Sequence, residues 1–205
     1  MLTTGVLDRR SRIDSFTFMA HRVCPWWAGY FLVSPLRRWM HDPAAIVGPY
    51  VSEGMTVLEP GPGMGFFTLE LARCVGSKGR VIAIDVQPKM LAGLVKRAAK
   101  LGLCDRIDAR LPKGERLGIE DYAGKVDFAL AFAMVHEVPN SSALLADLHT
   151  ALKPGGRLLF AEPAGHVRAQ AFEATLAQAS VAGFVLESRP TIRRSHAAVL
   201  VGRVT

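Results

Sequence analysis

The chain has 205 residues, of which 50% are hydrophobic and 21% charged, and its formal net charge is +7. This length and composition suit one globular domain with a substantial core, as in a soluble enzyme. No apolar run is long enough to cross a bilayer, and the first residues lack the apolar core of a signal peptide, so we expect a cytoplasmic protein. The three cysteines are odd in number and not closely paired, which argues against a disulfide framework or a CxxC metal site.

The positive charge is concentrated at the two ends of the chain. Residues 1–41 hold six arginines and two aspartates, residues 42–186 hold 15 basic and 15 acidic residues, and residues 187–205 hold four arginines and one glutamate. Excess arginine suits a planar anion, a phosphate backbone or an anionic membrane face. The alternative is that these charges only keep the protein soluble.

The first 50 residues are rich in aromatic side chains. Seven aromatic residues fall within 24 positions: Phe16, Phe18, Trp26, Trp27, Tyr30, Phe31 and Trp39. We predict that residues 1–50 form a helical cap or lid segment, which precedes a domain over residues 51–205. The aromatic side chains either pack on that domain, close over a flat acceptor, or rest with the flanking arginines on a membrane surface.

A glycine-rich turn follows the first predicted strand, which ends near Glu59. Gly61, Gly63 and Gly65 come before a short helix at 67–75, so backbone N–H groups at this strand-to-helix turn can meet a ligand. The dinucleotide fingerprint needs its third glycine where this chain has Phe66, so the spacing disfavours a hydride-transfer enzyme. The alternative is that the glycines only provide positive φ angles.

The second predicted strand, 79–85, ends in Asp85. A carboxylate at the carboxyl end of a parallel strand can accept both hydroxyl groups of a ribose, or it can simply cap the helix that opens at Pro88. That helix is predicted to be amphipathic, with its apolar residues at helical spacing. They are Leu91, Leu94, Val95, Ala98 and Leu101.

The remaining pattern alternates strands with helices. Strands are predicted at 106–111, 126–135 and 157–161, helices at 140–152 and 169–182, and closing strands at 183–187 and 197–201. Such alternation predicts an α/β fold with a mostly parallel sheet covered on both faces. The final hairpin-like pair would place one antiparallel strand in that sheet.

Candidate catalytic residues follow the fourth and fifth predicted strands. His136 and Glu137 come directly after the fourth, and a histidine there can take a proton from a hydroxyl or carbon acid near neutral pH. The alternative is that His136 only lines a pocket. Glu162 and His166 follow the fifth strand in the same way and are interpreted as pocket wall, with a catalytic role as the alternative. These groups, or His21 with Cys24, match no recognised metal-site spacing, and no metal is predicted.

Four segments, in this order and spacing, resemble the motifs of class I S-adenosylmethionine (SAM)-dependent methyltransferases of the small-molecule type 11 kind. They are Val57–Glu59 with the three glycines, Asp85, Val126–Phe132 and Leu152–Phe160. The resemblance covers residues 42–205. It implies SAM as cofactor and a Rossmann-like, doubly wound, mostly parallel seven-stranded sheet with an antiparallel last strand.

The resemblance also implies a set of cofactor-binding residues: Glu59, Gly61, Gly63, Gly65, Asp85, Val86, Met90, Leu111 and Ala131. In this family Glu59 would meet the amino group of the cofactor. Relatives often carry Gly-Asp-Ala after the third strand, where this chain has residues 111–113 without an acid. Adenine would therefore be held by backbone and by apolar walls such as Leu111 and Met90.

Three functions are compatible with this sequence. The first is methyl transfer to a small organic acceptor, such as an aromatic, quinone-like or lipidic metabolite. The second is an RNA or protein methyltransferase that uses the basic ends, although the chain has no Asn-Pro-Pro-Tyr-type motif after the fourth strand. The third is a SAM-binding protein that has lost catalysis and acts by interaction. The expected partner is therefore a small molecule, with nucleic acid or a membrane surface as alternatives, and no oligomeric state is predicted.

Overall fold

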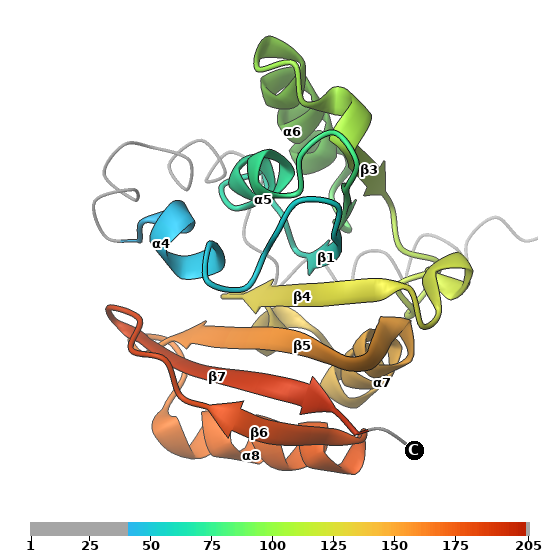
Figure 1. The fold of residues 1–205 in the computed structure, drawn as a ribbon. Coiled ribbons are helices and arrows are strands. Elements are labelled where there is room, and N and C mark those ends of the chain that lie inside the picture. The colour runs from blue at the N-terminus through green and yellow to red at the C-terminus, as the bar shows by residue number, and fades with distance from the viewer. Residues whose placement is uncertain (1–40, 204–205) are drawn as a thin grey trace, which may run out of the picture.

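A seven-stranded sheet runs through residues 41–203, the part of the chain that this computed structural model describes (Figure 1). The strand order is β3-β2-β1-β4-β5-β7-β6, and only β7 is antiparallel to its neighbours, as the sequence predicts. The strands are β1 (Thr56–Pro60), β2 (Arg80–Ile84), β3 (Ile107–Arg110), β4 (Val126–Phe132), β5 (Leu152–Pro163), β6 (Phe184–Ser188) and β7 (Ser195–Gly202).

Helices cover both faces of the sheet. The first face packs against α4 (Pro43–Val47), α5 (Thr68–Cys74) and α6 (Pro88–Lys100), and the second against α7 (Ser141–Ala151) and α8 (Ala169–Val181). Short 3-10 helices are η1 (Cys104–Arg106), η2 (Glu120–Tyr122) and η3 (Val135–Glu137). Because successive strand residues face opposite sides, Val57 belongs to the first core and Leu58 to the second, which explains why the strands are continuously apolar.

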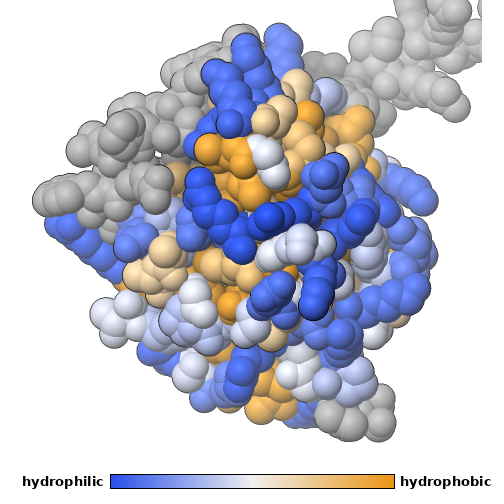
Figure 2. All heavy atoms as spheres, turned by 45° about the horizontal axis from the view of Figure 1, so that its top comes forward, coloured by the Kyte–Doolittle hydropathy of each residue, from blue (hydrophilic) through white to orange (hydrophobic). Residues whose placement is uncertain are grey.

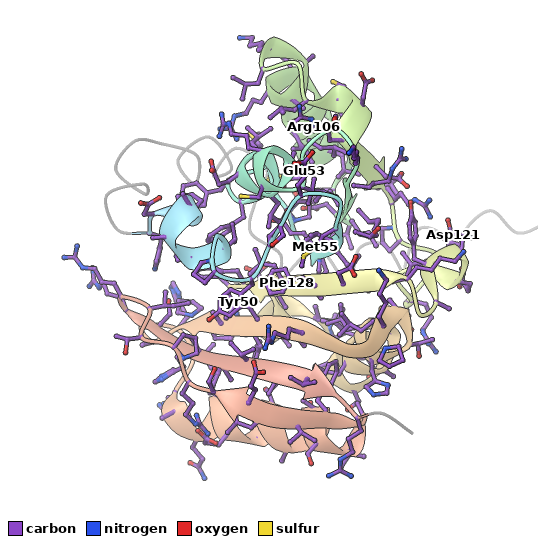
Figure 3. All side chains as sticks on the ribbon, in the orientation of Figure 1. Tyr50, Glu53, Met55, Arg106, Asp121 and Phe128 are labelled. Carbon is purple, nitrogen blue, oxygen red and sulfur yellow. The ribbon has the colours of Figure 1, made fainter. Side chains whose placement is uncertain are left out.

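The start of the described chain is fixed against the sheet. Asp42 caps α4 by accepting a hydrogen bond from Ala44 N at 3.0 Å. The ring of Tyr50, just after α4, stacks on Phe128 of β4 with centroids 5.6 Å apart (Figure 3). Residues 1–40 of the predicted helical cap lie outside the described residues. Within residues 41–203, no helix has both the length and the apolar character needed to span a membrane.

The helix α6 departs from the predicted packing. Leu91, Leu94 and Ala98 are buried as expected, but Val95 is 46% exposed and Leu101 is 49% exposed. Met90, in the first turn of the helix, is buried instead. Figure 2 brings this end of the molecule forward and shows hydrophobic surface between hydrophilic side chains.

Strand β4 is shorter, and β5 longer, than the sequence predicts. β4 ends at Phe132 and not at Val135, because Ala133 adopts a positive φ of 57° and the chain then turns into η3. β5 begins at Leu152, which pairs with Val126 before the register shifts so that Arg157 meets Phe128. The turn that ends β4 therefore determines where the residues after it lie.

A buried carboxylate anchors the connection between β3 and β4. Asp147 of α7 is 7% exposed and accepts hydrogen bonds from Arg116 Nε at 2.7 Å and from the backbone N of Leu117 at 2.9 Å. An unpaired buried amide costs more than an average hydrogen bond contributes. This carboxylate therefore holds the connection against the helix layer.

We predict that Asp147→Ala destabilises the fold, because the buried amide of Leu117 loses its acceptor at a cost of about 1–3 kcal/mol. The matched control is Asp121→Ala, which removes an exposed carboxylate bound to Arg110 (Figure 3). Exposed ion pairs contribute little, so this variant should unfold close to the wild-type urea midpoint. Equal losses in the two variants, measured by urea denaturation, would contradict the anchoring role of Asp147.

Candidate functional site

The three glycines of the turn after β1 meet two different requirements. All have positive φ angles, of 69° at Gly61, 55° at Gly63 and 83° at Gly65. A Cβ at Gly61 would lie 2.9 Å from Met134 Cβ, and one at Gly65 would collide with Leu94 Cδ1. A Cβ at Gly63 would meet nothing within 4 Å. Gly61 and Gly65 therefore allow close packing, while Gly63 faces open space that a ligand can use.

Asp85 joins β2 to this turn. Its carboxylate accepts hydrogen bonds from Gly63 N at 3.0 Å and from Gln87 N at 2.8 Å. The side chain is 8% exposed, and burial raises its pKa although the two amides act in the opposite direction; the charge of Glu137 adds to the rise. Each carboxylate oxygen accepts one hydrogen bond from an amide, so its second lone pair can accept a ligand hydroxyl. Asp85 thus shapes the turn and retains the capacity to bind a ribose.

The ends of β2 and β3 offer exposed apolar side chains beside Asp85. Val86 is 43% exposed and Leu111 is 51% exposed, and the two strand ends are joined by a 3.2 Å hydrogen bond from Asp85 N to Arg110 O. These side chains can flank a flat base. Met90, which we predicted as an adenine wall, is only 3% exposed, so Val86 and Leu111 are the more accessible apolar side chains on this side.

Two further predicted cofactor residues are buried in the sheet. Glu59 is 4% exposed near the end of β1, and Ala131 of β4 is fully buried. Glu59 lies one residue before Pro60, which pairs with Ile84 immediately before Asp85. The structure therefore brings Glu59 and Asp85 to neighbouring strand ends, whereas Ala131 can approach a ligand only through its backbone.

An imidazole just after β4 is hydrogen-bonded to a carboxylate at the end of β5. His136 Nδ1 is 2.6 Å from Glu162 Oε2, and the backbone N of His136 donates to Glu162 Oε1 at 3.1 Å. The hydrogen bond to Glu162 raises the pKa of His136 and outweighs the opposing effect of burial. Because Nδ1 faces this carboxylate, Nε2 is the nitrogen left to exchange a proton.

Glu162 is the partner of His136, a role that the sequence reasoning missed when it placed Glu162 in a pocket wall. The carboxylate is only 2% exposed, so it cannot form much of a wall. The signal was available in principle: β4 and β5 are parallel, and their last pair joins Phe132 to Ala161, which places the following residues side by side. Oε1 of Glu137, the other predicted catalytic residue, lies 3.9 Å from Nε2 of His136.

Acidic side chains dominate this edge of the sheet. Glu59, Asp85 and Glu162 are buried at the ends of three strands, and Glu137 is close enough to Asp85 to affect its pKa. A buried negative field favours a cationic ligand. Within residues 41–203, no group of three or more His, Cys, Asp or Glu side chains is arranged to hold a metal ion, and His21 and Cys24 lie outside that range.

A surface pocket of about 310 Å³ lies between α4 and the loop from β6 to β7. Its lining includes His41, whose ring contacts Phe132 edge-on with centroids 5.3 Å apart. Phe132 in turn contacts Phe67 at 4.6 Å, and Phe67 contacts Phe66 of the glycine turn at 5.0 Å. A row of rings therefore connects the glycine turn to the pocket.

Comparison with known proteins identifies a family for this fold. A family described as a methyltransferase domain matches residues 51–189. The chain is similar to the ubiquinone/menaquinone biosynthesis C-methyltransferase UbiE of Brucella suis, with 29% identity over 126 residues that cover 62% of this chain and 46% of that protein. The chain thus spans about half the length of the curated relatives it matches.

Among solved structures, a SAM-dependent methyltransferase from Aquifex aeolicus is similar over 89% of this chain and 100% of its own, with a TM-score of 0.78 and 25% identity. A SAM-dependent O-methyltransferase from Thermotoga maritima shares the fold with a TM-score of 0.65 at 21% identity, over 80% of this chain and 65% of its own. SAM is accordingly the expected cofactor. The open space above Gly63, the spare acceptor capacity of Asp85 and the acidic surroundings fit a nucleoside that carries a sulfonium.

Two glycine variants should separate folding from cofactor binding. Gly65→Ala combines a positive φ with a collision against Leu94, so we expect a clear loss of stability. Gly63→Ala meets only the positive φ, at a cost of about 1 kcal/mol, but its methyl group enters the open space of the site. Thermal unfolding and calorimetric titration with S-adenosylhomocysteine would check this, and normal cofactor affinity in Gly63→Ala would contradict the assignment.

Cofactor affinity should depend on the ionisation of Asp85. Its raised pKa means that the carboxylate is protonated at a higher pH than usual, and the protonated form is a poorer acceptor for two ribose hydroxyls. Affinity for S-adenosylhomocysteine should therefore be full above this pKa and fall as the pH is lowered through it. Asp85→Asn should bind more weakly at neutral pH and lose most of this dependence; an unchanged pH profile would count against the ribose contact.

Proposed function

Because the chain belongs to the methyltransferase-domain family that matches residues 51–189, we propose that it transfers a methyl group from SAM to a small organic acceptor. The observation that carries the proposal is the His136–Glu162 pair, which joins the turn after β4 to the end of β5. It supplies a proton acceptor at the edge of the sheet where α/β folds bind their ligands. The fold alone would not distinguish catalysis from binding.

Asp85, Glu59 and the glycine turn would hold the cofactor. In this proposal the carboxylate of Asp85 accepts the ribose hydroxyls, the backbone around Gly63 approaches the ligand closely, and Glu59 faces the amino group of its methionine part. Val86 and Leu111 flank the base. SAM, when bound, supplies a methyl group activated on a positively charged sulfur, so the protein mainly positions the acceptor and excludes water.

His136 would act as general base, with Glu162 as its positioning partner. Glu162 keeps the imidazole turned so that Nε2 faces the acceptor, and it stabilises the imidazolium that forms. The acceptor gives its proton to Nε2 and its electron pair to the methyl carbon. The electrons of the broken carbon–sulfur bond remain on sulfur, and S-adenosylhomocysteine leaves. Glu137 lies on the same side of the ring and adds negative charge near it.

The acceptor is proposed to be aromatic or quinone-like. The curated relatives are named as ubiquinone/menaquinone biosynthesis C-methyltransferases, which supports a ring acceptor for this chain as a hypothesis. The pocket between α4 and the β6–β7 loop, with its connection of rings to Phe66, would receive such a ring. Residues 1–50 would serve as a cap that completes this side, a proposal that follows from their aromatic content.

The direct test is to incubate the full chain with methyl-labelled SAM and a fractionated cell extract. The label should enter the small-molecule pool, with the lipid, RNA and protein pools as controls. Label in RNA or protein would favour the alternative suggested by the basic ends of the chain. Tight S-adenosylhomocysteine binding with no transfer to any pool would favour a catalytically silent binding protein.

Variants of Asp85 and His136 should affect different steps. Asp85→Ala should weaken cofactor binding by about tenfold or more, because the ribose loses charge-assisted hydrogen bonds. His136→Ala should leave binding nearly unchanged and lower kcat by about 100-fold or more, as expected for loss of a general base. Calorimetry and steady-state kinetics separate the two effects. Equal losses of affinity in both variants would contradict this division.

The Glu162→Gln variant tests whether the carboxylate positions and tunes the base. Because Glu162 raises the pKa of His136, replacing it should lower that pKa. The base is active when deprotonated, so the acid limb of the kcat profile should move to lower pH while the plateau falls, with the affinity for S-adenosylhomocysteine retained. A profile that keeps its acid limb in place would show that Glu162 has only a structural role.

A further inference from the structure

Basic side chains gather on two loops beside the proposed acceptor. The loop from β5 to α8 carries His166 and Arg168, and the loop from β6 to β7 carries Arg193 and Arg194. Residues 163–172 and 188–205 contain no aspartate or glutamate. We call His166, Arg168 and Arg194 the basic rim; all three are exposed.

The backbone holds the two loops together at the carboxyl end of β5. Ala164 N donates to Arg194 O at 2.9 Å, directly after the last register pair of β5 and β7, Pro163 with Ser195. Figure 1 shows the β6–β7 loop on the side where the arrows of β4 and β5 end. The rim is therefore tied to the edge of the sheet that carries the His136–Glu162 pair.

One ring contact connects the rim to the proposed base. The imidazole of His166 stacks on that of His136, with centroids 6.4 Å apart and planes at 11°. An acceptor whose proton reaches His136 Nε2 would therefore have the basic rim within the reach of a small molecule.

The arginines of the rim differ from several others among residues 41–203, which pair with carboxylates. Arg157 pairs with Glu187, and Arg189 pairs with Glu173. Within residues 41–203, neither Arg168 nor Arg194 forms an ion pair. Arginine pairs well with carboxylate and phosphate groups because its planar donors match their geometry. The cofactor side of the site is acidic while this side is basic, which suits a cationic cofactor and an anionic acceptor.

We propose that the methyl acceptor carries a carboxylate or phosphate group that the basic rim binds, so that the substrate is a small organic anion. This inference rests on the proposed methyl transfer. A small molecule is favoured over a polyanion because the β6–β7 loop also lines the 310 Å³ pocket, and because residues 42–186 have equal numbers of acidic and basic residues. Binding to a nucleic acid backbone needs many phosphate contacts over a wide basic surface.

The first test measures binding to the full chain saturated with S-adenosylhomocysteine. Benzoate and phenyl phosphate serve as anionic probes and benzamide as the neutral probe, and calorimetry measures the affinity for each. Both anions should bind more tightly than benzamide. The double variant Arg168→Ala/Arg194→Ala should lose about tenfold or more of the anion affinity, as expected for charge-assisted hydrogen bonds.

The matched control is Arg203→Ala. Arg203 follows β7, the antiparallel strand, so it lies at the opposite edge of the sheet, where its backbone N donates to Gly183 O. This variant should bind the anions as the wild type does, and all variants should keep their affinity for S-adenosylhomocysteine. Equal binding of benzamide and benzoate, or equal losses in the control and the double variant, would overturn the proposal.

The second test follows the label from methyl-labelled SAM through an anion exchanger, with and without phosphatase treatment. The labelled small molecule should be retained, and loss of retention after phosphatase would identify phosphate as the anionic group. Label only in the neutral fraction, or in RNA, would overturn the anionic small acceptor while leaving methyl transfer in place. Failure of the wild type to bind S-adenosylhomocysteine would instead reject the proposed function itself.

Discussion

The hydrogen bond from the amide of Gly63 to the carboxylate of Asp85 connects the two strand ends on which the site is built. β1 and β2 run side by side, and Gly61 N donates to Ile84 O at 2.8 Å just before this contact. The glycine turn is therefore positioned from the neighbouring strand as well as by its own conformations. Loss of the Asp85 carboxylate would release the amides of Gly63 and Gln87 as well as the proposed ribose contact, so effects on turn geometry and on cofactor binding would be coupled at this residue.

The site divides into an acidic and a basic half across the middle of the sheet. Carboxylates lie at the ends of β1, β2 and β5, and basic side chains lie on the loops beyond β5 and β6. Such a division would orient the proposed cationic cofactor and anionic acceptor before any contact forms between them. His136 lies at the boundary, bonded to Glu162 on one side and stacked on His166 on the other.

Most of the fold could be predicted from periodicity and from glycine and proline positions, because buried parallel strands and covering helices leave strong patterns. The number of strands and the antiparallel last strand followed from the family resemblance, and Asn140 was recognised as a helix start, where its side chain caps α7. The inward face of α6 was not predictable in detail: Met90 and Val95 are both apolar, and only the packing decides which is buried.

The site was predictable at its individual residues but not in its pairings. Gly63, Asp85 and His136 stand out by residue type and position. The hydrogen bond between His136 and Glu162 joins residues 26 positions apart and depends on the register between β4 and β5. The hydrophobic periodicity of one segment does not reveal its register against another strand. The aromatic segment before residue 41 lies outside the described residues, so its role as a cap stays a prediction.

The backbone conformation of Ala133 limits which residues can replace it at the bend after β4. It holds a left-handed conformation without being glycine, and its N donates to Ala161 O at 2.8 Å, so the neighbouring strand enforces the bend that leads to η3. Glycine, asparagine and aspartate adopt this conformation at little cost, whereas a β-branched side chain would push the chain back toward an extended strand. The position of the imidazole of His136, three residues later, thus depends on the bend at Ala133, and a β-branched residue here would displace the proposed base without replacing it.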